Sequence, residues 1–184
     1  MVKAIKMRNE SEILFELFCE QRSWGCEYLD GKYPGNKTPD YLVSAGGNGD
    51  FYAEVKEISN NRLTDQIAAR SSVFTMSAWR LFGWAEWDAT NALEKIKSLS
   101  ETPFYKPLPF VLIVYMNQAF VDQDINLYKN IFDKFESSNM LSAFGFLRGD
   151  GTGQETKYYL DLARNAKAKF AFPSIDFGYC LTNP

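Results

Sequence analysis

The sequence predicts an α/β domain in which helices flank a mixed central β-sheet. Three observations favour this class. The chain has 184 residues, of which 46% are hydrophobic, and this is enough for one domain with a sizeable core. Segments with the apolar spacing of amphipathic helices alternate with short apolar runs typical of strands. The order of these segments is helix, strands, helices, strand, helix and strand, as expected of a single layered domain spanning residues 1–184.

The first third of the chain predicts a helix followed by a β-hairpin. Residues 9–21 place apolar side chains on one helical face, and Asn9 is a plausible N-cap. A short strand is expected near residues 26–29. Residues 40–44 and 50–58 have the pattern of strands, and the glycine-rich segment between them is a strong turn signal.

The remaining two thirds predict further helices and strands around a proline-rich loop at residues 103–109. Three tryptophans, Trp79, Trp84 and Trp87, are expected to pack in the core rather than to stack on bases. The expected elements are a largely helical segment at 63–87, helices at 89–100 and 125–135, strands at 110–116 and 141–147, a loop at 149–153 and a helical tail at 158–169.

The composition excludes several kinds of catalysis. The sequence contains no histidine, so Ser-His-Asp and Cys-His machinery and a histidine general base are ruled out. Cys19, Cys26 and Cys180 form no CxxC motif, so we expect ordinary thiols and no zinc site. Proton transfer must therefore use carboxylates, lysines, tyrosines or metal-bound water.

The net charge and the lengths of the apolar runs indicate which partners and which cellular location to expect. The net charge of -3 is not that of an obvious nucleic-acid binder, although the local field at a site decides binding. The longest apolar run, at 110–116, is too short to span a bilayer, and charged residues occupy positions 1–11, where a signal peptide needs an apolar run. We therefore expect a cytoplasmic protein. Four basic residues near the C-terminus could form a phosphate-contacting surface, but a solvated helix face is the simpler interpretation: Lys157, Arg164, Lys167 and Lys169.

The hairpin places chemically useful side chains on one face. If Ser44 pairs with Asp50 across the turn, Asp40 lies opposite Glu54, with Cβ atoms ~5 Å apart. Lys56 projects from the same face as Glu54, because side chains alternate along a strand. Two opposed carboxylates with a lysine beside them suit Mg²⁺, which prefers carboxylate oxygens. The alternative is a surface hairpin with a solvated Glu-Lys pair.

These residues resemble the PD-(D/E)xK motif of the restriction-endonuclease-like nuclease superfamily, whose members include type II restriction enzymes and Holliday-junction resolvases. The matching residues are Pro39-Asp40, followed after a short turn by Glu54-Val55-Lys56. The resemblance covers about residues 10–58 and implies a restriction-endonuclease-like mixed sheet flanked by helices. It also implies that Asp40 and Glu54 bind Mg²⁺, or Mn²⁺ in its place, and that Lys56 positions or helps to activate the attacking water.

Members of the superfamily usually carry a glutamate on a helix before the motif, and Glu12 resembles that residue. Two interpretations of Glu12 remain open. In one it supports the metal site, and in the other it closes a capping box with Asn9. Glu10 and Glu16 are rivals for the metal-supporting role, because helix starts are uncertain by a residue or two.

The function expected from these residues is a metal-dependent endonuclease that hydrolyses DNA phosphodiesters with a metal-activated water. The alternatives are a catalytically silent nucleic-acid-binding or assembly protein on the same fold, and an RNA nuclease. A homodimer is a further expectation, since many relatives are dimers that use two centres to cut two strands.

Overall fold

The computed structural model describes residues 9–33, 35–58, 78–116, 139–150 and 157–173. These residues form an α/β arrangement with a mixed sheet, as the sequence predicts. The predicted helix at 125–135 and most of the predicted helical segment at 63–87 lie outside the described residues.

The first helix, α1 (Glu10–Gln21), begins at a complete capping box. The Asn9 side chain accepts a hydrogen bond from the Glu12 backbone N–H at 2.8 Å, and the Glu12 carboxylate accepts one from the Asn9 N–H at 2.9 Å. Both bonds satisfy N–H groups that a helix start would otherwise leave without a partner. The predicted helix and its N-cap are therefore confirmed.

The described strands form one six-stranded sheet in which sequential strands are neighbours. The first three strands pair antiparallel, the third to fifth pair in parallel, and the sixth is antiparallel to the fifth. The strands are β1 (Gly25–Tyr28), β2 (Tyr41–Ser44), β3 (Asp50–Ile58), β4 (Phe110–Met116), β5 (Ala143–Asp150) and β6 (Lys157–Arg164).

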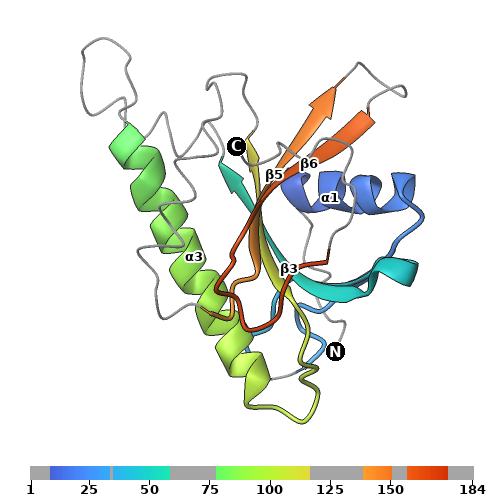
Figure 1. The fold of residues 1–184 in the computed structure, drawn as a ribbon, viewed down its shortest axis with the longest axis vertical. Helices are drawn as coiled ribbons and strands as arrows, with labels where there is room; N and C mark the ends of the chain where they lie inside the picture. The colour runs from blue at the N-terminus through green and yellow to red at the C-terminus, as the bar shows by residue number, and fades with distance from the viewer. Residues whose placement is uncertain (1–8, 34, 59–77, 117–138, 151–156, 174–184) are drawn as a thin grey trace, which may run out of the picture.

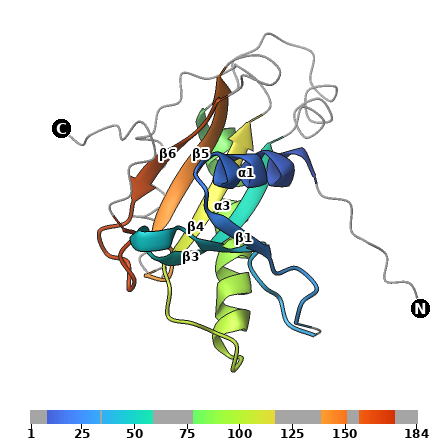
Figure 2. The same ribbon diagram turned by 90° about the vertical axis from the view of Figure 1, so that its right-hand side faces the viewer.

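Two helices cover opposite faces of the sheet (Figures 1 and 2). Phe51, Ala53 and Val55 of β3 join the buried cluster that includes Phe15 and Phe18 of α1. Neighbouring residues of the sheet join a second cluster with α3 (Ala78–Ser100). Its members include Tyr52, Leu112 and Val114 from the sheet and Ala89, Ala92, Ile96 and Leu99 from the helix. Strand alternation thus divides β3 between two cores, as predicted for its apolar face.

The predicted helical tail is wrong, because residues 157–164 form β6. Leu160 and Leu162 alternate with Asp161 and pack in the α1-side cluster, while Ala163 joins the α3-side cluster. This two-residue period is that of a strand. The start of the predicted 149–153 loop is also wrong, because Gly149 and Asp150 belong to β5.

Two surface predictions have different outcomes. Trp87 is 58% exposed, so the prediction that it packs in the core is wrong; the side chains of Trp79 and Trp84 lie outside the described residues. The four basic residues are exposed, as expected of a solvated face, but the predicted helix face is wrong because Lys157 and Arg164 lie on β6. No helix in the described part of the chain is both long and apolar enough to cross a membrane.

Candidate active site between the β2–β3 hairpin and helix α3

The hairpin register brings Asp40 beside Glu54, as predicted. Tyr41 pairs with Ala53 and Ser44 pairs with Asp50, so the preceding residue, Asp40, continues the same register toward Glu54. The turn contains a short 3-10 helix, η1 (Gly46–Asn48), and its bend uses positive φ angles of 62° at Gly46 and 91° at Gly49.

Two backbone N–H groups hold Asp40 in place, one from β3 and one from the loop after β1. Its Oδ2 atom accepts a hydrogen bond of 2.9 Å from the backbone N–H of Val55. Its carbonyl oxygen accepts one of 2.8 Å from the backbone N–H of Leu29. One main-chain donor therefore orients the carboxylate, and a second holds the backbone of Asp40.

Both carboxylates are removed from solvent, which changes the ionisation of Glu54. Glu54 is fully buried and Asp40 is only 4% exposed. Burial, and next the negative charge of Asp40, raise the pKa of Glu54 to about 7, although Lys56 and Lys95 act in the opposite direction. A carboxyl group that titrates near neutrality marks this cluster as a candidate functional site.

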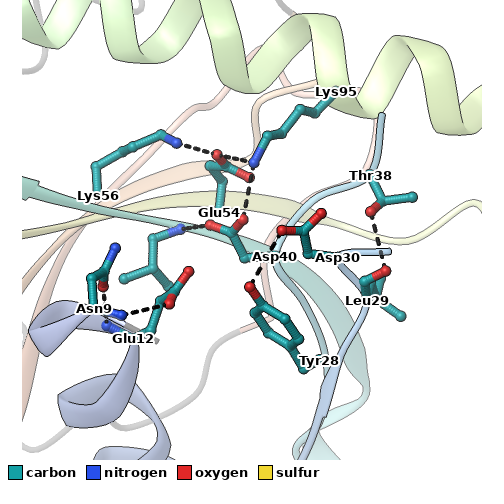
Figure 3. A network of polar contacts seen from close by, with 11 residues as sticks. Asn9, Glu12, Tyr28, Leu29, Asp30, Thr38, Asp40, Glu54, Lys56 and Lys95 are labelled. Carbon is teal, nitrogen blue, oxygen red and sulfur yellow. Dashed lines mark hydrogen bonds and ion pairs between the residues drawn. The ribbon is translucent and has the colours of Figure 1, made fainter. Parts of the chain in front are cut away.

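Two lysines approach the carboxylates from different elements (Figure 3). Lys56 of β3 places its Nζ atom 2.5 Å from Glu54 Oε1. Lys95 of α3 places its Nζ atom 2.6 Å from the same oxygen and 2.9 Å from Asp40 Oδ1. Lys56 was expected at this site on the strand face it shares with Glu54, whereas Lys95 was not.

Contacts between α3 and the loop before β2 bring Lys95 to the site. The backbone N–H of Lys37 donates to Ser98 Oγ at 3.2 Å, and the Lys37 ammonium pairs with Glu94 at the same distance. Ile96, the neighbour of Lys95, is buried against the sheet. The sequence contained a signal for Lys95, because this residue lies three positions after Ala92 and four before Leu99, both on the buried stripe of the helix.

The donor set fits a hard divalent cation. Glu54 Oε2 is buried and has no hydrogen-bond partner among the described residues. An oxygen in that condition is costly to bury unless something binds it. The nearby acceptors are carboxylate oxygens, which Mg²⁺ prefers. Within the described ranges, no group of three or more His, Cys, Asp or Glu side chains could hold a metal, so the acidic part of the site is the Asp40–Glu54 pair.

The carboxylates of α1 have other partners in the structure. Glu12 is 3% exposed and closes the capping box with Asn9. Glu16 accepts a hydrogen bond of 2.9 Å from the Tyr41 hydroxyl. Among the described residues, no hydrogen bond or ion pair joins Glu12 to Asp40 or Glu54, and α1 covers the sheet face opposite α3 (Figures 2 and 3). The structure therefore confirms the capping interpretation of Glu12, while a supporting role at the metal site stays a prediction.

Replacement of Glu12 by Gln separates its two roles. Glutamine also accepts a hydrogen bond at the third position of a capping box, so the melting temperature of Glu12→Gln should stay close to that of the wild type. If the carboxylate also supports a metal site, cleavage should fall by ~10-fold or more. Normal cleavage by Glu12→Gln, with loss of cleavage in Glu10→Gln or Glu16→Gln, would transfer the role to that residue.

The raised pKa of Glu54 predicts a pH-dependent stability. The folded protein keeps its proton on Glu54 up to about pH 7, whereas the ordinary pKa of this group is 4.5. The stability contributed by the protonated group is therefore full below the lower value and is lost as pH rises through the higher one. Asp40, Lys56 and Lys95 face this group, and all three remain in a Glu54→Gln variant.

The measurement is urea unfolding of wild type and Glu54→Gln in EDTA across this pH range. The free energy of unfolding of the wild type, relative to the variant, should fall by roughly 3 kcal/mol from the acidic to the neutral end. If the free energies of unfolding of the two proteins changed with pH in parallel, the pKa of Glu54 would be the same in the folded and the unfolded protein.

Comparison with known proteins gave no match among protein-family models, curated proteins or solved structures. Any role for these residues is therefore inferred from their positions and chemistry alone. The described site comprises two buried carboxylates, one directly before β2 and one on β3, with a lysine two positions further along β3 and a second lysine from α3.

Proposed function

We propose that the protein is a metal-dependent endonuclease that hydrolyses phosphodiester bonds in DNA. The observation that carries the proposal is the buried pair Asp40 and Glu54, with Lys56 beside Glu54 and an oxygen of Glu54 without a hydrogen-bond partner. The mixed sheet between two helices agrees in outline with the restriction-endonuclease-like fold that the motif implies.

Asp40 and Glu54 would hold Mg²⁺, or Mn²⁺ in its place. When bound, such an ion supplies a Lewis acid for the phosphate and lowers the pKa of water. The Val55 N–H keeps the Asp40 carboxylate oriented, and burial of Glu54 keeps bulk water away from its oxygens. Lys56 adds a positive charge where negative charge grows on the phosphate in the transition state.

The charge balance of the cluster also suits a phosphate substrate. When ionised, the two carboxylates are balanced by the ammonium groups of Lys56 and Lys95. A divalent cation would make this neutral cluster positive, and the positive field would attract a phosphate group. Binding of the metal would thus create a local anion site in a protein whose net charge is -3.

A second candidate is a nucleic-acid-binding or assembly protein without catalysis. The observation in its favour is that Lys95 bridges both carboxylates and, together with Lys56, balances their charge in the absence of metal. In this case the cluster is a buried ion-pair network that fixes α3 on the sheet.

The two candidates are distinguished by incubating the purified protein with supercoiled, linear, branched and single-stranded DNA and with RNA. Mg²⁺ or Mn²⁺ should support cleavage of at least one DNA form, and EDTA should stop it. Cleavage of RNA alone would make the protein an RNA nuclease. Binding without cleavage of any form, under either metal, would support the catalytically silent candidate.

A further inference from the structure

The Lys95 ammonium lies between the two carboxylates that would hold a metal ion. Its Nζ atom is 2.6 Å from Glu54 Oε1 and 2.9 Å from Asp40 Oδ1. Lys56 makes an ion pair with Glu54 alone among the described residues. Among the charged side chains in the described part of the protein, Lys95 is thus the one that bridges both carboxylates (Figure 3).

An ammonium group in this position competes with a divalent cation. Asp40 Oδ2 accepts a hydrogen bond from the Val55 N–H, so Oδ1, which Lys95 contacts, is the Asp40 oxygen that a metal ion would use. Lys95 also contacts Glu54, the other carboxylate of the pair. A metal ion held by Asp40 and Glu54 and an ammonium group that bridges the same two carboxylates would also repel each other strongly at a site removed from bulk water. The bridging position of Lys95 and metal binding by both carboxylates therefore exclude one another.

The Lys95 side chain is able to leave. Its side chain is 25% exposed, whereas the carboxylates it bridges are almost fully buried. A lysine has a flexible four-carbon stem, and a stem at the edge of an interface can carry the ammonium into water. Its helix stays in place through Ile96 and Leu99, which are buried in the α3-side core.

Departure of Lys95 without a replacement would leave two adjacent carboxylates in a buried site. Removing one partner from a buried ion pair is strongly destabilising. A divalent cation more than replaces the lost charge, whereas a monovalent cation only matches it. The metal-free protein should therefore keep Lys95 in the bridge until a divalent cation arrives.

We propose that Lys95 is a built-in counter-ion that occupies the cation position of the metal-free protein and is displaced when a divalent cation binds. The inference rests on the proposed metal site and adds a mechanism for it, an exchange of an ammonium group for a metal. This exchange weakens metal affinity, so that removal of the ammonium strengthens it.

The first test measures Mn²⁺ affinity by isothermal titration calorimetry without nucleic acid. Lys95→Met should bind Mn²⁺ at least ~10-fold more tightly than wild type, because the competing group is gone. Lys97→Met removes an exposed charge two residues away on the same helix and should leave the affinity unchanged. Lys56→Met removes a charge that touches Glu54 without bridging, and its gain should be smaller than that of Lys95→Met.

The outcomes separate this inference from the proposed function. If wild type and Lys95→Met bind Mn²⁺ with equal affinity, the metal site stands and the counter-ion role of Lys95 is overturned. An equal gain in Lys95→Met and Lys56→Met would also overturn it, since the effect would then be one of net charge. Failure of both wild type and Lys95→Met to bind Mn²⁺ would overturn the metal site itself.

A second test uses the wild-type protein and does not depend on the folding of a variant. Lysine acetylation, followed by mass spectrometry, reports how accessible each ammonium group is. Addition of Mn²⁺ should increase the labelling of Lys95 several-fold, because its ammonium moves into solvent, and should leave Lys97 unchanged. Labelling of Lys95 that does not respond to saturating Mn²⁺ would contradict displacement.

Discussion

Replacement of either buried carboxylate by its amide, in Asp40→Asn or Glu54→Gln, is expected to lower metal-dependent DNA cleavage on the order of 10²-fold or more. The amides keep the size of the side chains, and both positions are almost fully buried, so the core should stay packed. What is lost is the negative charge that would hold the cation. Rates measured under single-turnover conditions with saturating protein would report this loss.

Glu57→Gln is a matched control for Glu54→Gln. Glu57 lies on the same strand, three residues further along, and pairs with Tyr115, whose ring packs on the α1-side core. Side chains alternate along a strand, so Glu57 projects from the face opposite Glu54. Burial of Tyr115 and the nearby charges of Glu10 and Glu57 raise the pKa of that tyrosine. Cleavage by Glu57→Gln should match wild type. If Asp40→Asn and Glu54→Gln also cleaved DNA at the wild-type rate, the active centre would have to lie elsewhere in the protein.

The Lys56→Ala variant is expected to lose cleavage by ~100-fold while its affinity for DNA changes by no more than about twofold. Lys56 contacts Glu54 rather than an exposed binding surface, so its charge acts on the reacting phosphate more than on docking. Single-turnover rates would be compared with dissociation constants measured in Ca²⁺, which should support binding without fast cleavage. This pairing of rate and affinity separates transition-state stabilisation from binding.

Lys97→Ala controls for the loss of one positive charge near the site, because Lys97 is exposed on α3. It should cleave DNA like the wild type. An equal loss of binding and cleavage in Lys56→Ala would instead place Lys56 among the residues that position the phosphate backbone.

The hairpin and its site residues could be predicted because they depend on local rules. The glycine-rich turn fixed which residues pair, and the observed register from Tyr41 to Ser44 agrees with it. Alternation along β3 then determined that Glu54 and Lys56 share one face while Val55 enters the opposite core. The Asn9 capping box is equally local, since its partners lie three residues apart.

The features that sequence reasoning missed depend on tertiary contacts. Lys95 reaches Asp40 from 55 residues away in the chain, and only the docking of α3 shows that its ammonium faces the hairpin. Glu54 is also fully buried, which the alternation of side chains along β3 does not predict. In β6, Leu160 and Leu162 have the two-residue period of a strand, although the tail was predicted to be helical. Pairing with β5 decides between the two.

The most direct test of the central claim is to locate a bound Mn²⁺ ion by paramagnetic broadening of backbone amide signals in an NMR spectrum of the 21.0 kDa protein. The Asp40–Glu54 site predicts selective broadening of the amides of Asp40, Val55 and Lys95 at substoichiometric Mn²⁺. In the Asp40→Asn, Glu54→Gln double variant this broadening should disappear. Broadening centred on another part of the chain, or identical broadening in the double variant, would contradict the assignment of Asp40 and Glu54 as the metal site.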